Sequence, residues 1–398
     1  METKEQQPIP FALPDIGREE EEAVLRVLRS GWLTTGKEAI SFEKEFAEAV
    51  SAHSALAVNS ATAGLHLAAE ALGVCPGDKV VTTPFTFTST AEILRYLGAD
   101  PIFADIDEET LTIDPRCVAE ILDREPKIKG VIPVHLGGRM AEMDRIVSEA
   151  KKRGLFVIED AAHAFPLSYK GKAAGTIGDA GVFSFYATKT ITTGEGGMVV
   201  TDNEALAKRM SVMRLHGIDR DVWDRYSSSK GSWRYAVVAA GYKYNLTDLA
   251  AAIGRVQLKR AQEFKERRCR IASYYEAELG GIEALKLPKP PGRKEDHAWH
   301  LFIVRLRPGY SAIDRDGMVE ALKARGIGTS VHYIALHLMP YYRSRYNLSP
   351  EQFPVATAVS NSCFSLPIYP SMSDGQVERV VEAIKELLSP NRRRTQTQ

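Results

Sequence analysis

Short apolar runs alternate with amphipathic stretches through the first two-thirds of the chain. Five apolar runs are predicted strands: 55–58, 79–82, 101–104, 130–134 and 155–158. Residues 62–72 and 88–97 are predicted helices that stop at Gly73 and Gly98. Strands that are apolar on both faces and alternate with helices predict an α/β fold with a mainly parallel sheet. Ligands of such sheets bind beyond the carboxyl ends of the strands.

The pattern changes in the last third of the chain. A long helix is predicted from the Thr247-Asp248 cap toward Tyr275, and it links two domains. A strand at 300–306, a helix at 315–325 and an apolar stripe within 377–388 then predict a smaller C-terminal α+β domain. The predicted boundaries are 14–250 for the large domain, 251–390 for the linking helix and small domain, and 391–398 for a disordered tail.

Composition restricts the location and the partners. Lys+Arg and Asp+Glu both number 51, so no net charge favours nucleic acid or an anionic membrane. The four cysteines are widely spaced, which suits neither a disulfide framework nor a zinc site, and no metal is expected. The N-terminal residues have no apolar signal core, and no apolar run is long enough to span a bilayer. We therefore expect a cytoplasmic protein that neither binds nucleic acid nor inserts into a membrane.

Two charged residues stand at the ends of apolar runs. Lys189 follows Val182-Phe183-Ser184-Phe185 and precedes a glycine-rich turn, and Asp160 ends the run that begins at residue 155. Most lysines are solvated surface charges, and an aspartate after a strand often caps a turn, so each residue alone is a weak signal. Together they are the two groups that pyridoxal phosphate (PLP) needs. The amine forms a Schiff base with the aldehyde, and the carboxylate keeps the ring nitrogen protonated.

Other residues could complete a PLP site. The segment 59–64 lies between a strand and a helix, where unpaired N–H groups suit a phosphate, although small polar residues also begin helices as ordinary caps. Ser184, on the strand before the lysine, is a second phosphate candidate. Phe87 follows a strand and could stack on the pyridine ring, and His163 could contact the ring or its phenolic oxygen. Both residue types are more often structural, so they are candidates only because of their neighbours.

These motifs resemble the DegT/StrS family of PLP-dependent nucleotide-sugar aminotransferases in their order and spacing. The resemblance extends from about Pro14 to Pro390 and includes segments 31–36, 241–248 and 297–300. It implies a fold-type I aminotransferase dimer with PLP as cofactor. It also implies transfer of an amino group from L-glutamate, which becomes 2-oxoglutarate, to a keto sugar nucleotide. The similarity is greatest to the branch that makes UDP-4-amino-4-deoxy-L-arabinose for lipid A modification, so a UDP-4-keto sugar is the expected substrate. Residues 333–340 depart from that branch, which leaves the particular sugar, the base and the aminated carbon (C3 or C4) open.

The resemblance assigns roles to particular residues. Expected to act in catalysis are Lys189, Asp160 and His163. Expected to bind the cofactor are these three together with Thr62, Ala63, Phe87, Ser184 and Asn245, the last reaching the phosphate of the neighbouring subunit. Expected near the sugar nucleotide are Trp32, Thr34, Thr35 and His332.

The segment from Asp221 to Lys243 breaks the periodicity at Ser227-Ser228-Ser229-Lys230-Gly231 and leads directly into Asn245. It is predicted to be an exposed excursion. With the resemblance, it predicts an obligate homodimer in which the partner's loop completes each active site, the alternative being a mobile surface loop. Two other functions remain open. One is a PLP-dependent sugar dehydratase, in which a histidine replaces the lysine, and the other is a non-catalytic sensor.

Overall fold

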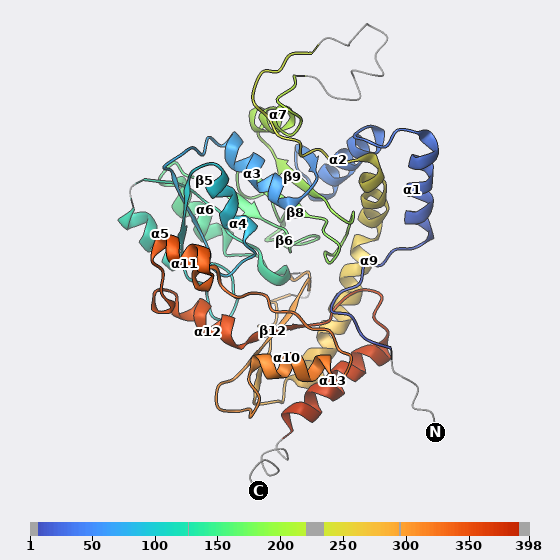
Figure 1. Ribbon diagram of the computed structural model, residues 1–398, viewed down its shortest axis with the longest axis vertical. Helices are drawn as coiled ribbons and strands as arrows, with labels where there is room; N and C mark the ends of the chain where they lie inside the picture. The colour runs from blue at the N-terminus through green and yellow to red at the C-terminus, as the bar shows by residue number, and fades with distance from the viewer. Residues whose placement is uncertain (1–6, 126, 220–234, 294–295, 390–398) are drawn as a thin grey trace.

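The computed structural model describes residues 7–125, 127–219, 235–293 and 296–389. Its centre is a seven-stranded sheet with the strand order β1-β9-β8-β5-β4-β2-β3 (Figure 1). The strands are β1 Ser54–Val58, β2 Lys79–Thr82, β3 Asp100–Phe103, β4 Ile128–Val131, β5 Phe156–Asp160, β8 Ala180–Ser184 and β9 Gly197–Thr201. Five of these strands correspond to the predicted apolar runs, so the mainly parallel sheet is confirmed.

One strand of the large sheet runs against the others. β9 pairs antiparallel with both of its neighbours, β1 and β8, whereas the remaining neighbours pair parallel. The connection from β8 to β9 contains no helix, and a direct return of this kind gives antiparallel pairing, because parallel neighbours need a longer crossover. The sheet is therefore mixed at one side, which the apolar pattern did not reveal.

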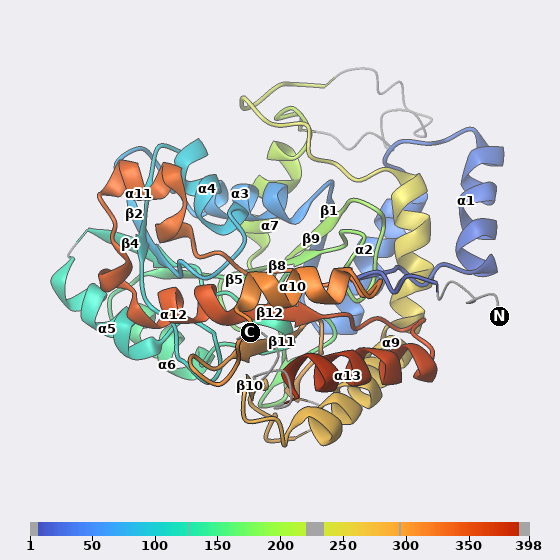
Figure 2. The same ribbon diagram turned by 60° about the horizontal axis from the view of Figure 1, so that its bottom comes forward.

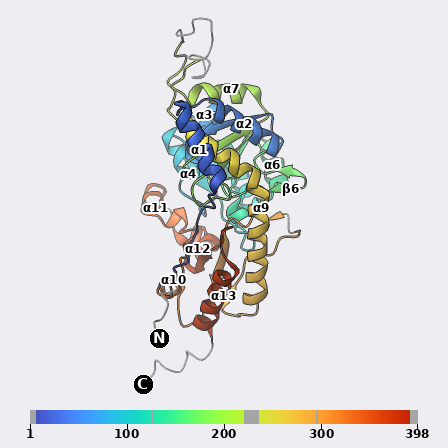
Figure 3. The same cartoon turned by 90° about the vertical axis from the view of Figure 1, so that its right-hand side faces the viewer.

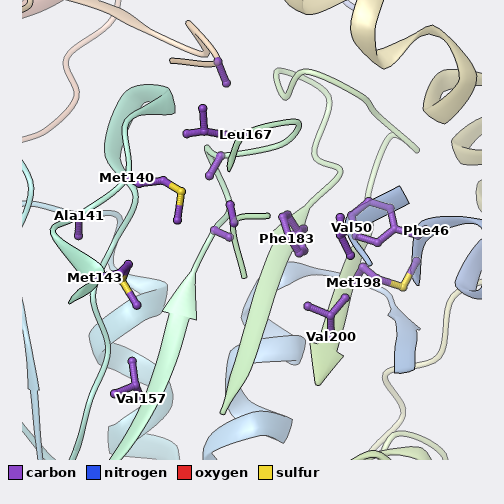
Figure 4. Packing of buried hydrophobic residues seen from close by; sticks show 14 of the residues in the cluster. Phe46, Val50, Met140, Ala141, Met143, Val157, Leu167, Phe183, Met198 and Val200 are labelled. Carbon is purple, nitrogen blue, oxygen red and sulfur yellow. The ribbon is translucent and has the colours of Figure 1, made fainter. Parts of the chain in front are cut away.

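Helices cover both faces of this sheet. On one face lie α2 Lys37–Val50, α5 Pro115–Arg124, α6 Met143–Lys151 and the first half of α9 Asp248–Leu279. On the other lie α3 Ala61–Ala71, α4 Ser89–Tyr96 and α7 Glu204–Met213. Adjacent residues of one strand point to the two helix layers. Phe183 packs with Phe46 of α2 (Figure 4). Val182 packs with the α3 layer on the other face. This alternation explains why these strands are apolar on both faces.

Glycine ends two of the predicted helices as expected. Gly73 follows α3 with a φ of 79°, and Gly98 follows α4 with a φ of 74°. These values lie in the left-handed region that glycine enters without steric cost. After these two stops the chain returns to form β2 and β3, and the segment that follows β2 lines the site described below.

The C-terminal third forms a smaller α+β layer below the large sheet (Figure 1). Its antiparallel sheet has the order β10-β11-β12, and helices α10 and α13 pack with it in one core. The bounds are β10 Leu285–Lys286, β11 Phe302–Leu306, β12 Cys363–Leu366, α10 Arg315–Lys323, α11 Pro340–Tyr346, α12 Pro354–Ser362 and α13 Asp374–Leu388. The structure also has a small hairpin, formed by β6 Ser168–Tyr169 and β7 Lys172–Ala173. Its short helices are η1 Leu136–Gly138, η3 Leu336–Leu338 and η4 Pro350–Gln352.

Helix α9 joins the two layers and has 32 residues (Figures 2 and 3). It begins as predicted, because the Thr247 side chain accepts a hydrogen bond from the Ala250 N–H at 3.3 Å. Its first half packs against α2 and against α1 Arg18–Ser30, and its second half contributes to the core of the smaller layer. The boundary near residue 250 stays a prediction.

Two predicted segments and the predicted location concern features beyond the described residues. The Ser227 to Gly231 stretch and the tail 391–398 lie outside the described residues. Within the described part, no helix combines the length and apolar character needed to cross a bilayer. The same residues contain no group of three or more His, Cys, Asp or Glu side chains placed to hold a metal ion. The cytoplasmic location remains a prediction.

Candidate active site

A cavity of about 1310 Å³ opens at the carboxyl ends of the parallel strands. Asp160 is the last residue of β5, and Ser184 is the last residue of β8, the strand next to it in the sheet. Lys189 lies in the loop that follows β8. All three line the cavity, together with residues that come from the smaller layer. The site thus forms where the strand ends of the large sheet meet the C-terminal layer.

Lys189 is partly buried in this cavity. Its backbone N–H donates to the carbonyl of Tyr186 at 2.9 Å, which fixes a turn directly after β8. Burial disfavours the ammonium form and lowers the pKa of Lys189 to about 8, while the charge of Asp160 acts in the opposite direction. At pH 7 about a tenth of such a side chain is the free amine, far more than in a lysine with the usual pKa of 10.5, and a nucleophilic lysine needs this form.

Asp160 is buried, and both of its carboxylate oxygens are hydrogen-bonded. Oδ2 accepts from the Thr90 hydroxyl at 2.8 Å, and Oδ1 accepts from the Ala162 N–H at 3.2 Å. Burial raises the pKa of Asp160, and these two bonds and the charge of Lys189 act to lower it. A buried carboxylate that faces a cavity is stabilised by a cation placed there.

His163 is held in one neutral form by its neighbours. Its Nδ1 accepts from the Gly137 N–H at 3.3 Å, so the ring proton resides on Nε2, which lies 3.2 Å from the Tyr333 hydroxyl oxygen. Burial lowers the pKa of His163 well below its usual value. With Nε2–H donating to Tyr333, the tyrosine's own O–H is left available for a ligand in the cavity.

The first turn of α3 lines the same cavity through Ser60, Ala61 and Thr62. Ser60 is the N-cap, and its hydroxyl accepts from the Ala63 N–H at 3.1 Å. Of the predicted phosphate residues on this strand and helix, Thr62 and Ser184 line the cavity. Ala63 does not line it, and its backbone N–H is bonded to Ser60. A side chain at Gly197 would place its Cβ only 2.8 Å from the Ala61 nitrogen, so glycine keeps this helix end open.

Phe87 and His332 line the cavity from opposite layers. The Phe87 side chain follows β2 and is 58% exposed, which leaves a ring face free for contact with a flat ligand. His332 Nδ1 pairs with the Ser365 hydroxyl at 2.8 Å, and burial lowers the pKa of His332 to about 3. His332 is therefore neutral at physiological pH and acts as a hydrogen-bonding group.

The other four predicted residues lie together but do not line this cavity. Asn245 Nδ2 donates to the Thr35 hydroxyl at 2.6 Å, and Trp32 Nε1 donates to the Thr35 carbonyl at 3.2 Å. The carbonyl of Thr34 accepts from the Asp248 N–H at 3.2 Å at the start of α9. These four residues form what we call the Thr35 cluster. Within one chain, the cluster is separate from the Lys189 cavity.

A second buried carboxylate lies directly before Asp160. Glu159 accepts hydrogen bonds from the N–H groups of Gly175, Ile177 and Gly178 at 3.0, 2.6 and 2.7 Å. His135 Nε2 lies 2.8 Å from Glu159 Oε2, and the His135 N–H donates to the Asp160 carbonyl at 3.0 Å. Burial alone would raise the pKa of Glu159, but these donors hold it below its usual value. The end of β5 is thereby fixed from two sides.

Sequence reasoning missed several residues that line the cavity or support it. Thr90 contacts Asp160 across 70 positions, and Tyr333 contacts His163 across 170. The His300 ring packs against His163 in a tilted arrangement, with ring centroids 4.4 Å apart and an interplanar angle of 46°. Its segment had been noted, at 297–300, but no role followed from a lone histidine. No local pattern links such distant positions, so the fold was needed to find them.

A lysine, a carboxylate and a helix N-terminus that line one cavity of an α/β fold are the groups expected for the predicted class of PLP-dependent aminotransferases. A family model described as the DegT/DnrJ/EryC1/StrS aminotransferase family matches residues 14–385. The chain therefore belongs to that family. The predicted family is confirmed, and so is the fold-type I class of the fold.

Individual relatives agree with this membership. The chain is 47% identical over 383 residues to the spore coat polysaccharide biosynthesis protein SpsC of Bacillus subtilis (strain 168), a match covering 96% of this chain and 97% of SpsC. The PLP-form of Spr1654 from Streptococcus pneumoniae superposes with a TM-score of 0.87 at 30% identity, covering 96% and 98% of the two chains. DesI, solved in the presence of its TDP-sugar product, superposes with a TM-score of 0.85 at 31% identity, covering 98% and 95%.

Proposed function

We propose that this aminotransferase uses PLP to move an amino group from L-glutamate to a keto sugar nucleotide, with a UDP-4-keto sugar as the substrate. The observation that carries the proposal is the presence of Lys189 and Asp160 in one cavity, each affecting the pKa of the other. The product would be an amino sugar nucleotide for a cell-surface polysaccharide or a lipid A-type modification.

The residues of the cavity fit PLP. The open first turn of α3 and the Ser184 hydroxyl offer donors to a phosphate, and Phe87 offers a ring face. Asp160 is a buried carboxylate in need of a cation, and a protonated pyridine nitrogen is one. When bound, the cofactor supplies an aldehyde for the amino group and a ring that withdraws electrons from the substrate carbon.

The chain's own groups then have distinct tasks. Lys189 attaches the cofactor and, when it is released as an amine, carries the proton to and from the substrate carbon. Its pKa of about 8 suits this task near neutral pH. His163 remains neutral and orients the Tyr333 hydroxyl, which donates into the cavity. Residues of both layers line the cavity around these groups.

The nucleotide-sugar part of the proposal has separate support. The cavity volume of about 1310 Å³ exceeds what PLP alone needs, since drug-sized ligands occupy pockets of roughly 300–1,000 Å³. SpsC is named for polysaccharide biosynthesis, and DesI was solved with a TDP-sugar. His332 lies within the cavity, where we expect the sugar to reach it.

A homodimer would bring the Thr35 cluster to the cavity of the partner. Asn245, Trp32, Thr34 and Thr35 lie together outside the cavity of their own chain. Exposed apolar side chains surround this part of the molecule on and near α1 and α2: Leu13, Ile16, Leu25, Leu28, Leu33 and Ile40. Such a surface is typical of one that a second subunit covers.

Absorbance and amino-group transfer test the proposal. We expect the purified protein to bind PLP with a visible band that glutamate shifts, and to transfer ¹⁵N from labelled glutamate to one member of a panel of keto sugar nucleotides. Borohydride reduction and peptide mapping should place the label on Lys189. Asp160→Asn should lower kcat more than it changes the KM for the sugar, since the carboxylate acts on the reacting state.

Other outcomes would contradict the proposal. A label on another lysine would show that the cofactor site is misplaced. Loss of a sugar hydroxyl without ¹⁵N transfer would favour the dehydratase, and PLP binding with no glutamate response would favour the sensor. The presence of Lys189 beside Asp160 speaks against both alternatives.

A further inference from the structure

Thr90 touches the catalytic carboxylate from a separate element. It is the second residue of α4, is fully buried, and places its Oγ1 2.8 Å from Asp160 Oδ2. A buried hydroxyl this close to a buried carboxylate forms a charge-assisted hydrogen bond, which is stronger than a neutral one. The start of α4 and the end of β5 are therefore joined through these two side chains.

A second hydroxyl fixes the direction of the Thr90 bond. Thr86 Oγ1 lies 2.9 Å from Thr90 Oγ1, and the carbonyl of Phe87 lies 3.3 Å from the same atom. Thr90 has one proton to give, and the carboxylate is the nearer and more strongly accepting partner. Thr86 must then donate to Thr90, which produces a directed series from Thr86 to Thr90 to Asp160.

This series determines how Asp160 meets a ligand. With Thr90 on Oδ2 and the Ala162 N–H on Oδ1, the plane of the carboxylate is fixed from both sides. Burial raises the pKa of Asp160, and the Thr90 bond is the first of the contacts that lower it again. Without that bond, the carboxylate would accept a proton more readily and would be free to rotate.

We propose that Thr90, oriented by Thr86, is a positioning residue that keeps Asp160 ionised and aimed at the ring nitrogen of the cofactor. The inference rests on the proposed binding of PLP in this cavity. Thr90 contacts Asp160 and not the reacting atoms, so its effect reaches the cofactor only through that carboxylate.

The Thr90→Val variant tests this role, because valine keeps the shape of threonine and lacks the hydroxyl. We expect its dissociation constant for PLP, measured by equilibrium dialysis on protein freed of cofactor, to rise about tenfold. The pH below which PLP affinity falls should move upward by about one unit, since Asp160 would protonate earlier. The titratable groups that face Asp160 are Lys189, His135 and Tyr333, and the substitution leaves all of them in place.

Two variants serve as controls. Thr90→Ser retains the hydroxyl and should restore both the affinity and its pH dependence. Thr82→Val removes an equally buried hydroxyl, which donates to the Ile132 carbonyl at 2.8 Å away from Asp160, and should leave PLP binding unchanged.

The outcomes separate this inference from the proposed function. If wild-type protein binds PLP and Thr90→Val behaves as Thr82→Val does, the positioning role is wrong and the proposed function stands. If Thr90→Ser fails to restore what Thr90→Val loses, packing rather than the hydroxyl is responsible, which also overturns the inference. Failure of the wild type to bind PLP would instead overturn the proposed function.

Discussion

At the scale of single residues, Lys189 differs from an ordinary surface lysine in its proton affinity. Burial lowers its pKa from 10.5 to about 8, and Asp160 partly opposes the change. We expect amine-reactive labelling of Lys189 in cofactor-free protein to rise through a midpoint near pH 8, as followed by peptide mass spectrometry. In Asp160→Asn the midpoint should move lower, because the charge that favours the ammonium form is lost.

Lys170 gives an internal reference in the same experiment. It is paired with Asp144 at the surface, and this contact raises its pKa above the usual value. Its labelling should therefore rise at a higher pH than that of Lys189 and should not respond to Asp160→Asn. Equal midpoints for the two lysines would contradict the pKa assigned to Lys189.

Some single residues of the site could be predicted from the sequence and others could not. Asp160 and Ser184 are the last residues of strands and Lys189 lies in the loop after one of them, and apolar runs mark these strands in the sequence. Thr90 becomes a neighbour of Asp160, and Tyr333 a neighbour of His163, only through tertiary packing. A threonine or tyrosine in such a role stands in no characteristic sequence motif, so the sequence does not distinguish Thr90 and Tyr333 from ordinary buried residues.

At the scale of elements, Glu159 ties the end of β5 to the loop at 175–178. Three backbone N–H groups and His135 point at one carboxylate. Glu159→Gln places an amide NH₂ where an acceptor is required, so it leaves donors unpaired in a buried place. We expect a loss of about 3 kcal/mol in the free energy of unfolding, measured by urea denaturation.

A surface glutamate provides the comparison for that measurement. Glu149 bonds with Lys152 and Arg153 at the exposed side of α6. Exposed ion pairs contribute little to stability, so Glu149→Gln should leave the urea midpoint nearly unchanged. A similarly small effect of Glu159→Gln would show that the buried network is not needed for stability.

At this scale, the positions of most strands and of α9 could be predicted from the sequence, whereas the direction of β9 could not. Five strands of the large sheet and α9 were predicted because short apolar runs mark the strands and a helix cap marks the start of α9. The reversed direction of β9 could not be found, because the residues of a strand buried on both faces look the same in either direction. Direction is set by the connection before the strand, and that connection was interpreted only as a tight turn.

At the scale of the whole molecule, the proposed dimer predicts that mixing two inactive variants restores part of the activity. Lys189→Ala and Asn245→Asp should each be inactive, the second because an added carboxylate would repel the phosphate. In a mixed dimer, both lesions fall in one site and the other site is intact. We expect an equal mixture, after subunit exchange, to recover about a quarter of the wild-type rate, because half of the dimers are mixed and each has one working site.

The mixing experiment needs its own controls. Exchange must be shown with differently tagged subunits, and Asn245→Asp must be inactive by itself. No recovery under those conditions would place Asn245 in the site of its own chain or in no site. A monomer in solution would exclude sharing altogether.

The length of α9 has a consequence for how the protein opens and closes. At about 1.5 Å per residue its 32 residues extend for about 48 Å. Ala261 and Phe264 belong to the core of the large layer, and Ile271 and Tyr275 belong to the core of the smaller one. Backbone amides at the middle of this helix should therefore exchange hydrogen only when both cores unfold together. The two layers would then unfold as one cooperative unit. Any movement of the two layers that admits a substrate must then leave α9 folded.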